Sequence, residues 1–127
     1  MTKEEFVKKL TDSVKVGDVF DNPGGGTSTI ESIDTSENGF IKYKRGKNFR
    51  PKIKFESMHD AYSQFPNGFS TNDLKNFNPE VFKLEAGGHG CNCTFLMMML
   101  KQMGIVKQIE GSMKPKDLPF RVKINKQ

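Results

Sequence analysis

The dipeptide Asn38-Gly39 constrains the fold of this chain more than any other feature of its sequence. Asn-Gly between stretches of strand-forming residues is a strong signal for a two-residue hairpin turn. Strand composition occurs on both sides of it, over Thr27 to Ile33 and Phe40 to Lys44, and again over Pro51 to Phe55. This part of the chain is therefore predicted to form an antiparallel meander.

Segments with helical spacing flank the meander. Thr2 and Glu5 have the spacing of a capping box, which predicts a short N-terminal helix. Apolar residues at helical spacing predict a second helix over residues 58–65. A brief third helix, through residues 74–77, is predicted to end at Asn78-Pro79.

The last third of the chain adds one more helix and two strands. Cys91 to Met103 has the composition of a buried helix that ends at Gly104. Ile105 to Ile109 and Phe120 to Ile124 are predicted strands around a Gly/Pro/Lys loop. Residues 1–127 are therefore predicted to form a single α+β domain, an antiparallel β-sheet meander with several short helices packed on it.

Composition argues against several classes of protein. The 127-residue chain has no run near the ~18 consecutive apolar residues that a membrane helix needs. Its first residues, MTKEEFVKKL, lack the apolar core of a signal peptide. Two cysteines separated by one residue cannot staple a small fold. We expect a cytoplasmic protein with no membrane partner.

Basic residues are concentrated in one block. The chain has 20 basic and 15 acidic side chains, and residues 40–54, FIKYKRGKNFRPKIK, hold seven of the basic ones and no acid. Such a block suits an anionic partner. Lysines on surface strands also keep strand edges unpaired, so solubility alone is an alternative explanation.

The stretch GGHGCNCTFLMMML, residues 87–100, carries most of the candidate chemistry. His89, Cys91 and Cys93 are potential metal ligands, but a structural zinc usually has four ligands in spaced pairs. A cysteine at a helix N-terminus beside a histidine can act as a nucleophile, although cysteine is more often a small buried group. We expect no metal, no cofactor and no catalytic cysteine.

A backbone site for an anion is the third interpretation of this stretch. Glycines let the main chain approach a ligand, and the first amides of the following helix favour negative charge. Asn92 adds a side chain that donates and accepts hydrogen bonds, as a nucleobase edge or ribose hydroxyl requires. Alternatively, the glycines only form a tight loop and Asn92 or Thr94 caps the helix. A second glycine-rich bend, GGGTST at residues 24–29, slightly favours the anion site.

Two apolar features have alternative explanations. The Phe, Leu and Met side chains of residues 95–103 are predicted to pack in the core, with surplus apolar surface covered by another subunit. Phe82 is either a core residue or a flat platform at the mouth of the glycine loop, where base–aromatic stacking contributes on the order of 1–3 kcal/mol.

The segments NPGGGTSTI, IKYKRGK, NPEVF and GGHGCNCTFLMMML together resemble the phage Thoeris anti-defence protein 1 family, over most of the chain from about Val16 onward. The resemblance implies a non-enzymatic protein of the infected bacterial cell that sequesters glycocyclic ADP-ribose, the signal of the Thoeris immune system. It also implies ligand pockets at a homodimer interface and, as in some members, hexamers with separate sites for cyclic oligonucleotides.

By this resemblance, Phe82 stacks on the adenine and Asn92 is the pocket asparagine. Basic residues for the phosphates are chosen from this sequence on chemical grounds alone. The full predicted ligand-binding set is Phe82, Gly90, Cys91, Asn92, Thr94, Arg45, Arg121 and Lys123.

Two other functions remain open. One is a phosphodiesterase or glycohydrolase that acts on a cyclic nucleotide with His89 as general acid or base. The other is a nucleic-acid-binding domain that uses the basic block, with an affinity that falls steeply with salt. The lack of a convincing carboxylate pair disfavours the enzyme. A net charge of only +5 disfavours the nucleic-acid binder, so no DNA partner is expected.

Overall fold

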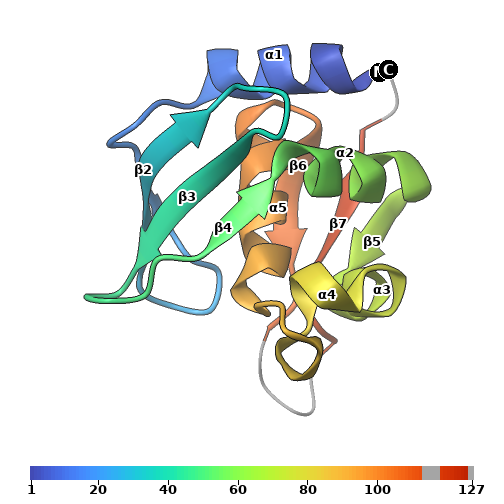
Figure 1. Ribbon diagram of the computed structural model, residues 1–127. Coiled ribbons are helices and arrows are strands. Elements are labelled where there is room, and N and C mark those ends of the chain that lie inside the picture. The colour runs from blue at the N-terminus through green and yellow to red at the C-terminus, as the bar shows by residue number, and fades with distance from the viewer. Residues whose placement is uncertain (113–117, 126–127) are drawn as a thin grey trace.

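The computed structural model describes residues 1–112 and 118–125, and within them it confirms the α+β class. Figure 1 shows the arrangement of these elements. The helices are α1 (Lys3–Ser13), α2 (Phe55–Gln64), α3 (Thr71–Phe77), α4 (Pro79–Phe82) and α5 (Cys91–Gln102), with a 3-10 turn η1 (Leu84–Ala86). The strands are β1 (Val19–Asp21), β2 (Thr27–Asp34), β3 (Phe40–Arg45), β4 (Lys52–Lys54), β5 (Gly68–Ser70), β6 (Val106–Glu110) and β7 (Arg121–Ile124).

The predicted meander forms one antiparallel sheet with the strand order β1-β2-β3-β4. The loop between β2 and β3 is longer than the predicted two-residue turn, because Asp34 pairs with Phe40 and leaves residues 35–39 outside the ladder. The Asp34 carboxylate accepts a hydrogen bond from the Ser36 amide at 2.8 Å. Gly39 is needed there for close packing, since a Cβ at this position would overlap the Asp34 carbonyl oxygen.

The second sheet, with the order β5-β7-β6, corrects the expectation of a single sheet. The two C-terminal strands occur where the sequence predicts them. Strand β5, which pairs with β7, lies directly after Asn67, where the sequence predicts only a turn. Most of the predicted Gly/Pro/Lys loop between β6 and β7 lies outside the described residues.

The helix boundaries follow their capping residues. The predicted capping box of α1 is confirmed, because the Glu5 amide donates to Thr2 Oγ1 and the Thr2 amide donates to Glu5 Oε1, both at 3.1 Å. Ser70 caps α3 in the same way. The predicted end of this helix at Asn78-Pro79 is confirmed, because α3 stops at Phe77 with Asn78 as its C-cap. Pro79 also begins α4, since the missing N–H of proline costs nothing in a first helical turn.

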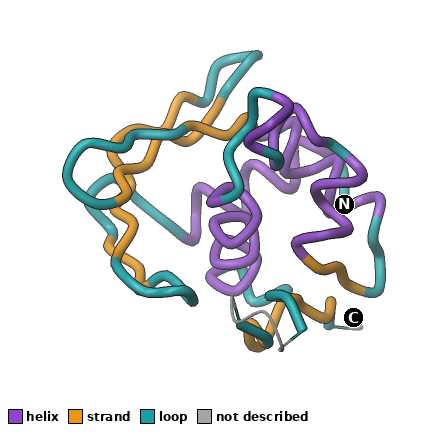
Figure 2. Tube along the Cα trace, turned by 90° about the horizontal axis from the view of Figure 1, so that it is seen from below, coloured by secondary structure: helices purple, strands orange, loops and turns teal. Residues whose placement is uncertain are grey.

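Helix α5 lies between the two sheets and forms the centre of the molecule (Figures 1 and 2). Every residue from Asn92 to Leu100 is buried. A helix that is apolar on all sides is covered on all sides. Here the cover comes from the chain's own helices α1, α3 and α4 and from its sheets, for example Tyr43 of β3, whose ring stacks on Phe95 with ring centres 3.8 Å apart. The apolar run of residues 95–103 therefore does not require a second subunit, which corrects the reason given for expecting one.

In the described parts of the chain, no helix is long and apolar enough to span a membrane.

Candidate functional site

A cleft of about 770 Å³ opens between the edge of the first sheet and the segment that leads into α5. Strand β4 and its turn form one wall, and α4 with the glycine-rich bend forms the other. This volume is within the roughly 300–1,000 Å³ typical of small-molecule sites. The lining residues are Phe40, Lys42, Arg50, Pro51, Lys52, Ile53, Lys54, Ser57, Asn78, Glu80, Val81, Gly87, Gly88, His89 and Asn92.

The strand wall of the cleft is basic. It carries Lys42, Arg50, Lys52 and Lys54, while Glu80 is the one acid among the described lining residues. Arg50 is partly neutralised by Glu31 at 2.9 Å. Lys52 places its ammonium 4.8 Å from the centre of the Phe40 ring, a cation–π geometry. Of the described residues, none forms an ion pair with the three lysines, so their charges are available to an anion.

The opposite wall is shaped by Gly88. An added Cβ would lie 2.5 Å from the Val81 carbonyl carbon, so only glycine allows the bend to pack on α4. Two backbone bonds hold this contact: the Gly88 amide donates to the Lys83 carbonyl at 2.9 Å, and the His89 amide donates to the Val81 carbonyl at 3.0 Å. The glycine brings the chain close to its own backbone, as the tight-loop alternative expects.

The amides at the start of α5 are only partly free. Gly90 is the N-cap residue and provides no side-chain cap. The Asn92 amide donates to the His89 carbonyl at 3.0 Å, and the Cys93 amide donates to the Gly90 carbonyl at 3.1 Å. The Thr94 hydroxyl is also occupied, since it donates to the Cys91 carbonyl at 3.2 Å. Neither Asn92 nor Thr94 caps the helix. Of the backbone amides expected to bind an anion here, those of Gly90 and Cys91 remain available.

Asn92 lies at the inner end of the cleft and joins three elements. Its amide nitrogen donates to the Val81 carbonyl at 3.1 Å, and its oxygen accepts from the Tyr43 hydroxyl at 2.7 Å. Only 2% of the residue is exposed. Burial raises the pKa of Tyr43, which keeps this hydroxyl a donor. Asn92 therefore fixes α4 and β3 to α5, and both ends of its amide group are used inside the protein.

Phe82 is a core residue in this structure. Its exposed fraction is 0%, and it lies at the end of α4 directly behind the cleft residue Val81. Neither face of the ring is open to a ligand, which corrects the expected stacking role. An aromatic ring at a loop mouth and one in the core have the same local sequence signal. The ring belongs to the hydrophobic core.

The three basic residues chosen on chemistry alone lie elsewhere. Arg121 is on β7 in the second sheet and pairs with Glu110 at 3.3 Å. Lys123 is exposed on the same strand. Arg45 is at the end of β3, where its amide bonds to the Phe49 carbonyl. None of these three residues lines the cleft.

The cysteines have the character of structural groups. Burial raises the pKa of the Cys93 thiol to about 12, so the thiol is protonated at neutral pH and is a poor nucleophile. The Cys91 sulfur lies 3.3 Å from the Tyr43 hydroxyl. His89 packs edge-on against Phe49, with ring centres 5.0 Å apart. In residues 1–112 and 118–125, no group of three or more His, Cys, Asp or Glu side chains is placed to hold a metal ion.

The strand wall is the part of the site that sequence reasoning left unassigned. The basic block was recognised, but Lys42, Lys52 and Lys54 were not placed in a site because the sequence does not show which segment lies across from them. Comparison of this chain with protein-family models, curated proteins and solved structures finds no match.

Proposed function

We propose that this chain binds and sequesters an anionic nucleotide of the glycocyclic ADP-ribose type without degrading it. In a phage-infected bacterium, such a sponge blocks activation of the Thoeris effector. One observation carries the proposal: the basic block and the glycine-rich bend, about 40 residues apart in sequence, form opposite walls of one cleft.

The charges of the cleft fit a pyrophosphate. Lys42, Lys52 and Lys54 are on neighbouring strands, and their ammonium groups have no acidic partner in the described residues. Hydrogen bonds from a charged donor contribute roughly 1.5–3 kcal/mol each. Two or three of them, together with the rings of Phe40 and His89 in the cleft wall, suit a nucleotide diphosphate better than a neutral metabolite.

The functional groups of the described cleft favour binding over hydrolysis. A glycosidase requires two carboxylates across the scissile bond, and the described lining contains one, Glu80. His89 is packed on Phe49, and none of the described carboxylates forms an ion pair with its ring. Sequestration requires only that the ligand stays bound and intact.

The test is incubation of the purified protein with glycocyclic ADP-ribose, followed by heat release and mass spectrometry. Intact ligand in a stoichiometric amount supports the sponge. A processed product, retained or free in solution, supports the phosphodiesterase or glycohydrolase. Ligand that is neither retained nor altered contradicts both.

Charge reversal locates the site. Lys42→Glu should weaken binding roughly ten- to a hundredfold in calorimetry, because an attractive charge becomes a repulsive one. The matched control is Lys107→Glu, an exposed lysine of β6 with the same change in net charge. Equal losses in the two variants would show that only overall charge matters, as for a nonspecific nucleic-acid binder.

A further inference from the structure

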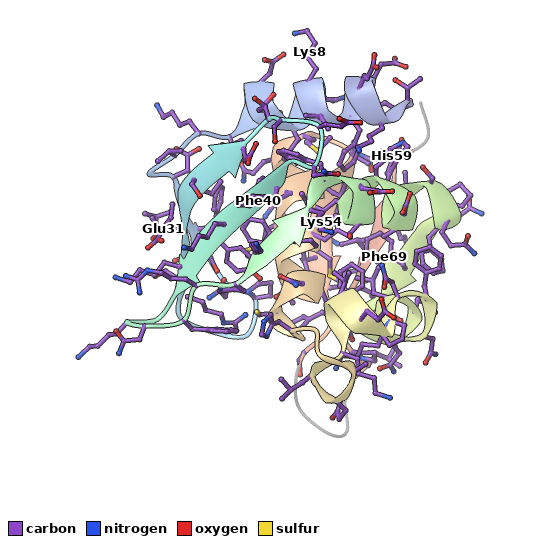
Figure 3. All side chains as sticks on the ribbon, in the orientation of Figure 1. Lys8, Glu31, Phe40, Lys54, His59 and Phe69 are labelled. Carbon is purple, nitrogen blue, oxygen red and sulfur yellow. The ribbon has the colours of Figure 1, made fainter. Side chains whose placement is uncertain are left out.

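Strand β4 has a free edge that faces the cleft. It is the last strand of the sheet order β1-β2-β3-β4, so within residues 1–112 and 118–125 only its β3 side is paired. Lys52, Ile53 and Lys54 all line the cleft, and Val81, Gly88 and His89 belong to the other wall. Figure 1 shows β4 at the sheet edge nearest α4, and Figure 3 labels Lys54 where β4 meets α2.

The hydrogen-bond ladder determines which backbone groups point outward. The Tyr43 amide donates to the Pro51 carbonyl at 3.0 Å, and the Phe55 amide donates to the Gly39 carbonyl at 3.1 Å. In an antiparallel ladder, bonded and non-bonded pairs alternate. The pairs Lys42–Lys52 and Phe40–Lys54 are therefore non-bonded pairs of the ladder. The Lys52 carbonyl and the Lys54 amide point away from β3, to the side of the cleft.

These two groups are a matched acceptor and donor. A carbonyl and the amide two residues later are neighbours on one strand edge, so together they bond a partner that presents a donor beside an acceptor. Adenine has this pattern, because its exocyclic amino group donates and the adjacent ring nitrogen accepts. Hypoxanthine reverses it, since a carbonyl oxygen replaces the amino group.

The free edge is too short for a peptide strand. Strand β4 has only three residues, and α2 begins directly after it at Phe55, where the Lys54 carbonyl serves as the N-cap acceptor of the helix. The outward groups are therefore confined to Lys52 and Lys54. A planar base needs no more than one acceptor and one donor.

We infer that the main chain of β4 reads the adenine edge of the ligand, with the Lys52 carbonyl accepting from the amino group and the Lys54 amide donating to the adjacent ring nitrogen. This inference rests on the proposed nucleotide function and assigns base specificity to the backbone. The lysine side chains of the same strand then remain available for the phosphates.

Substitution of Lys54 by proline tests whether the Lys54 amide donates a hydrogen bond to the ligand. Lys54 has φ −73° and ψ 144°, which proline adopts without strain, and its amide is not part of the ladder. Lys54→Pro removes the amide proton and the charge, whereas the matched variant Lys54→Ala removes only the charge. Glycocyclic ADP-ribose should bind roughly three- to tenfold more weakly to the proline variant than to the alanine variant. Equal affinities would overturn the inference.

A ligand analogue tests the same contact without a mutation. The unmodified protein should bind the hypoxanthine analogue of glycocyclic ADP-ribose roughly tenfold or more weakly than the adenine form. If circular dichroism shows that the proline variant does not fold, the comparison of the two ligands on the unmodified protein tests the inference instead. Equal binding of both ligands overturns base reading and leaves the proposed function standing. Binding of neither ligand overturns the proposed function itself.

Discussion

The two glycine-rich bends of this chain look alike in sequence and differ in structure. In residues 24–26, between β1 and β2, the glycines are exposed, and Gly25 has a φ of 109° with nothing within 4 Å of an added Cβ. In residues 87–90, Gly88 is buried against the backbone of Val81 and lines the basic cleft. One bend uses the conformational freedom of glycine, and the other uses its small size.

The difference shows that a glycine-rich bend becomes a candidate site only through what lies across from it. The 24–26 bend is held by a hydrogen bond between the residues that flank it, because the Ser28 hydroxyl donates to the Asn22 side-chain oxygen at 2.6 Å. The 87–90 bend faces Lys52 and Lys54 across the cleft. Its packing on α4 also fixes the shape of that wall of the cleft. A substitution there should affect both stability and binding.

The largest effect is expected for Phe82, the buried ring on α4, the helix against which the 87–90 bend packs. Phe82→Ala removes a fully buried ring and should lower the free energy of unfolding by about 3–5 kcal/mol, measured by urea denaturation. Phe77→Ala is the control, because Phe77 is 38% exposed and should cost far less. A Phe82→Ala protein as stable as the wild type that has lost ligand binding would restore the stacking role of this ring.

Exchange of glycine for alanine in each bend tests the comparison directly. Gly88→Ala forces a Cβ into the Val81 backbone and should cost about 1–3 kcal/mol together with a loss of glycocyclic ADP-ribose binding. Gly25→Ala meets no neighbour and should cost only the backbone term, about 1–2 kcal/mol, with binding retained. Thermal unfolding and calorimetry measure the two quantities. Binding that survives in Gly88→Ala would separate the bend from the site.

Local signals predicted most of the fold. The capping pair Thr2 and Glu5 predicted the start of α1, and strand composition over Phe40 to Lys44 predicted β3. Strand β5 escaped prediction because its only partner in the described chain is β7, about 50 residues away. A three-residue strand has almost no pattern of its own. Its existence depends on a tertiary pairing that the sequence does not display.

The sequence indicated each wall of the cleft separately, but it did not indicate that the two walls face each other. Charge density marked the strand wall, and glycine content marked the opposite wall. Sequence could not decide whether Phe82 was buried, because a core position and a stacking position favour the same ring. Arg121 was misplaced for a related reason, since its cross-strand partner Glu110 is recognisable only once the register of β6 and β7 is known.

The smallest effect concerns the cysteines that follow the 87–90 bend, and it is visible only at alkaline pH. Burial raises the pKa of Cys93 to about 12 in the folded protein, whereas an unfolded thiol has a pKa near 8.5. Below that lower pKa both states hold the proton and stability is unaffected. Above it the unfolded state releases a proton that the folded state keeps, so stability falls as pH rises, by at most about 1.4 kcal/mol per pH unit.

Urea denaturation between about pH 8 and pH 10 should therefore show a shallower loss of stability in Cys93→Ala than in the wild type. Cys91→Ala is the control, because Cys91 is in the same helix and is only partly buried. The 24–26 bend has no buried thiol beside it, and Gly25→Ala should keep the wild-type slope. Equal slopes in the wild type and in Cys93→Ala would mean that the Cys93 thiol ionises as readily in the folded protein as in the unfolded chain.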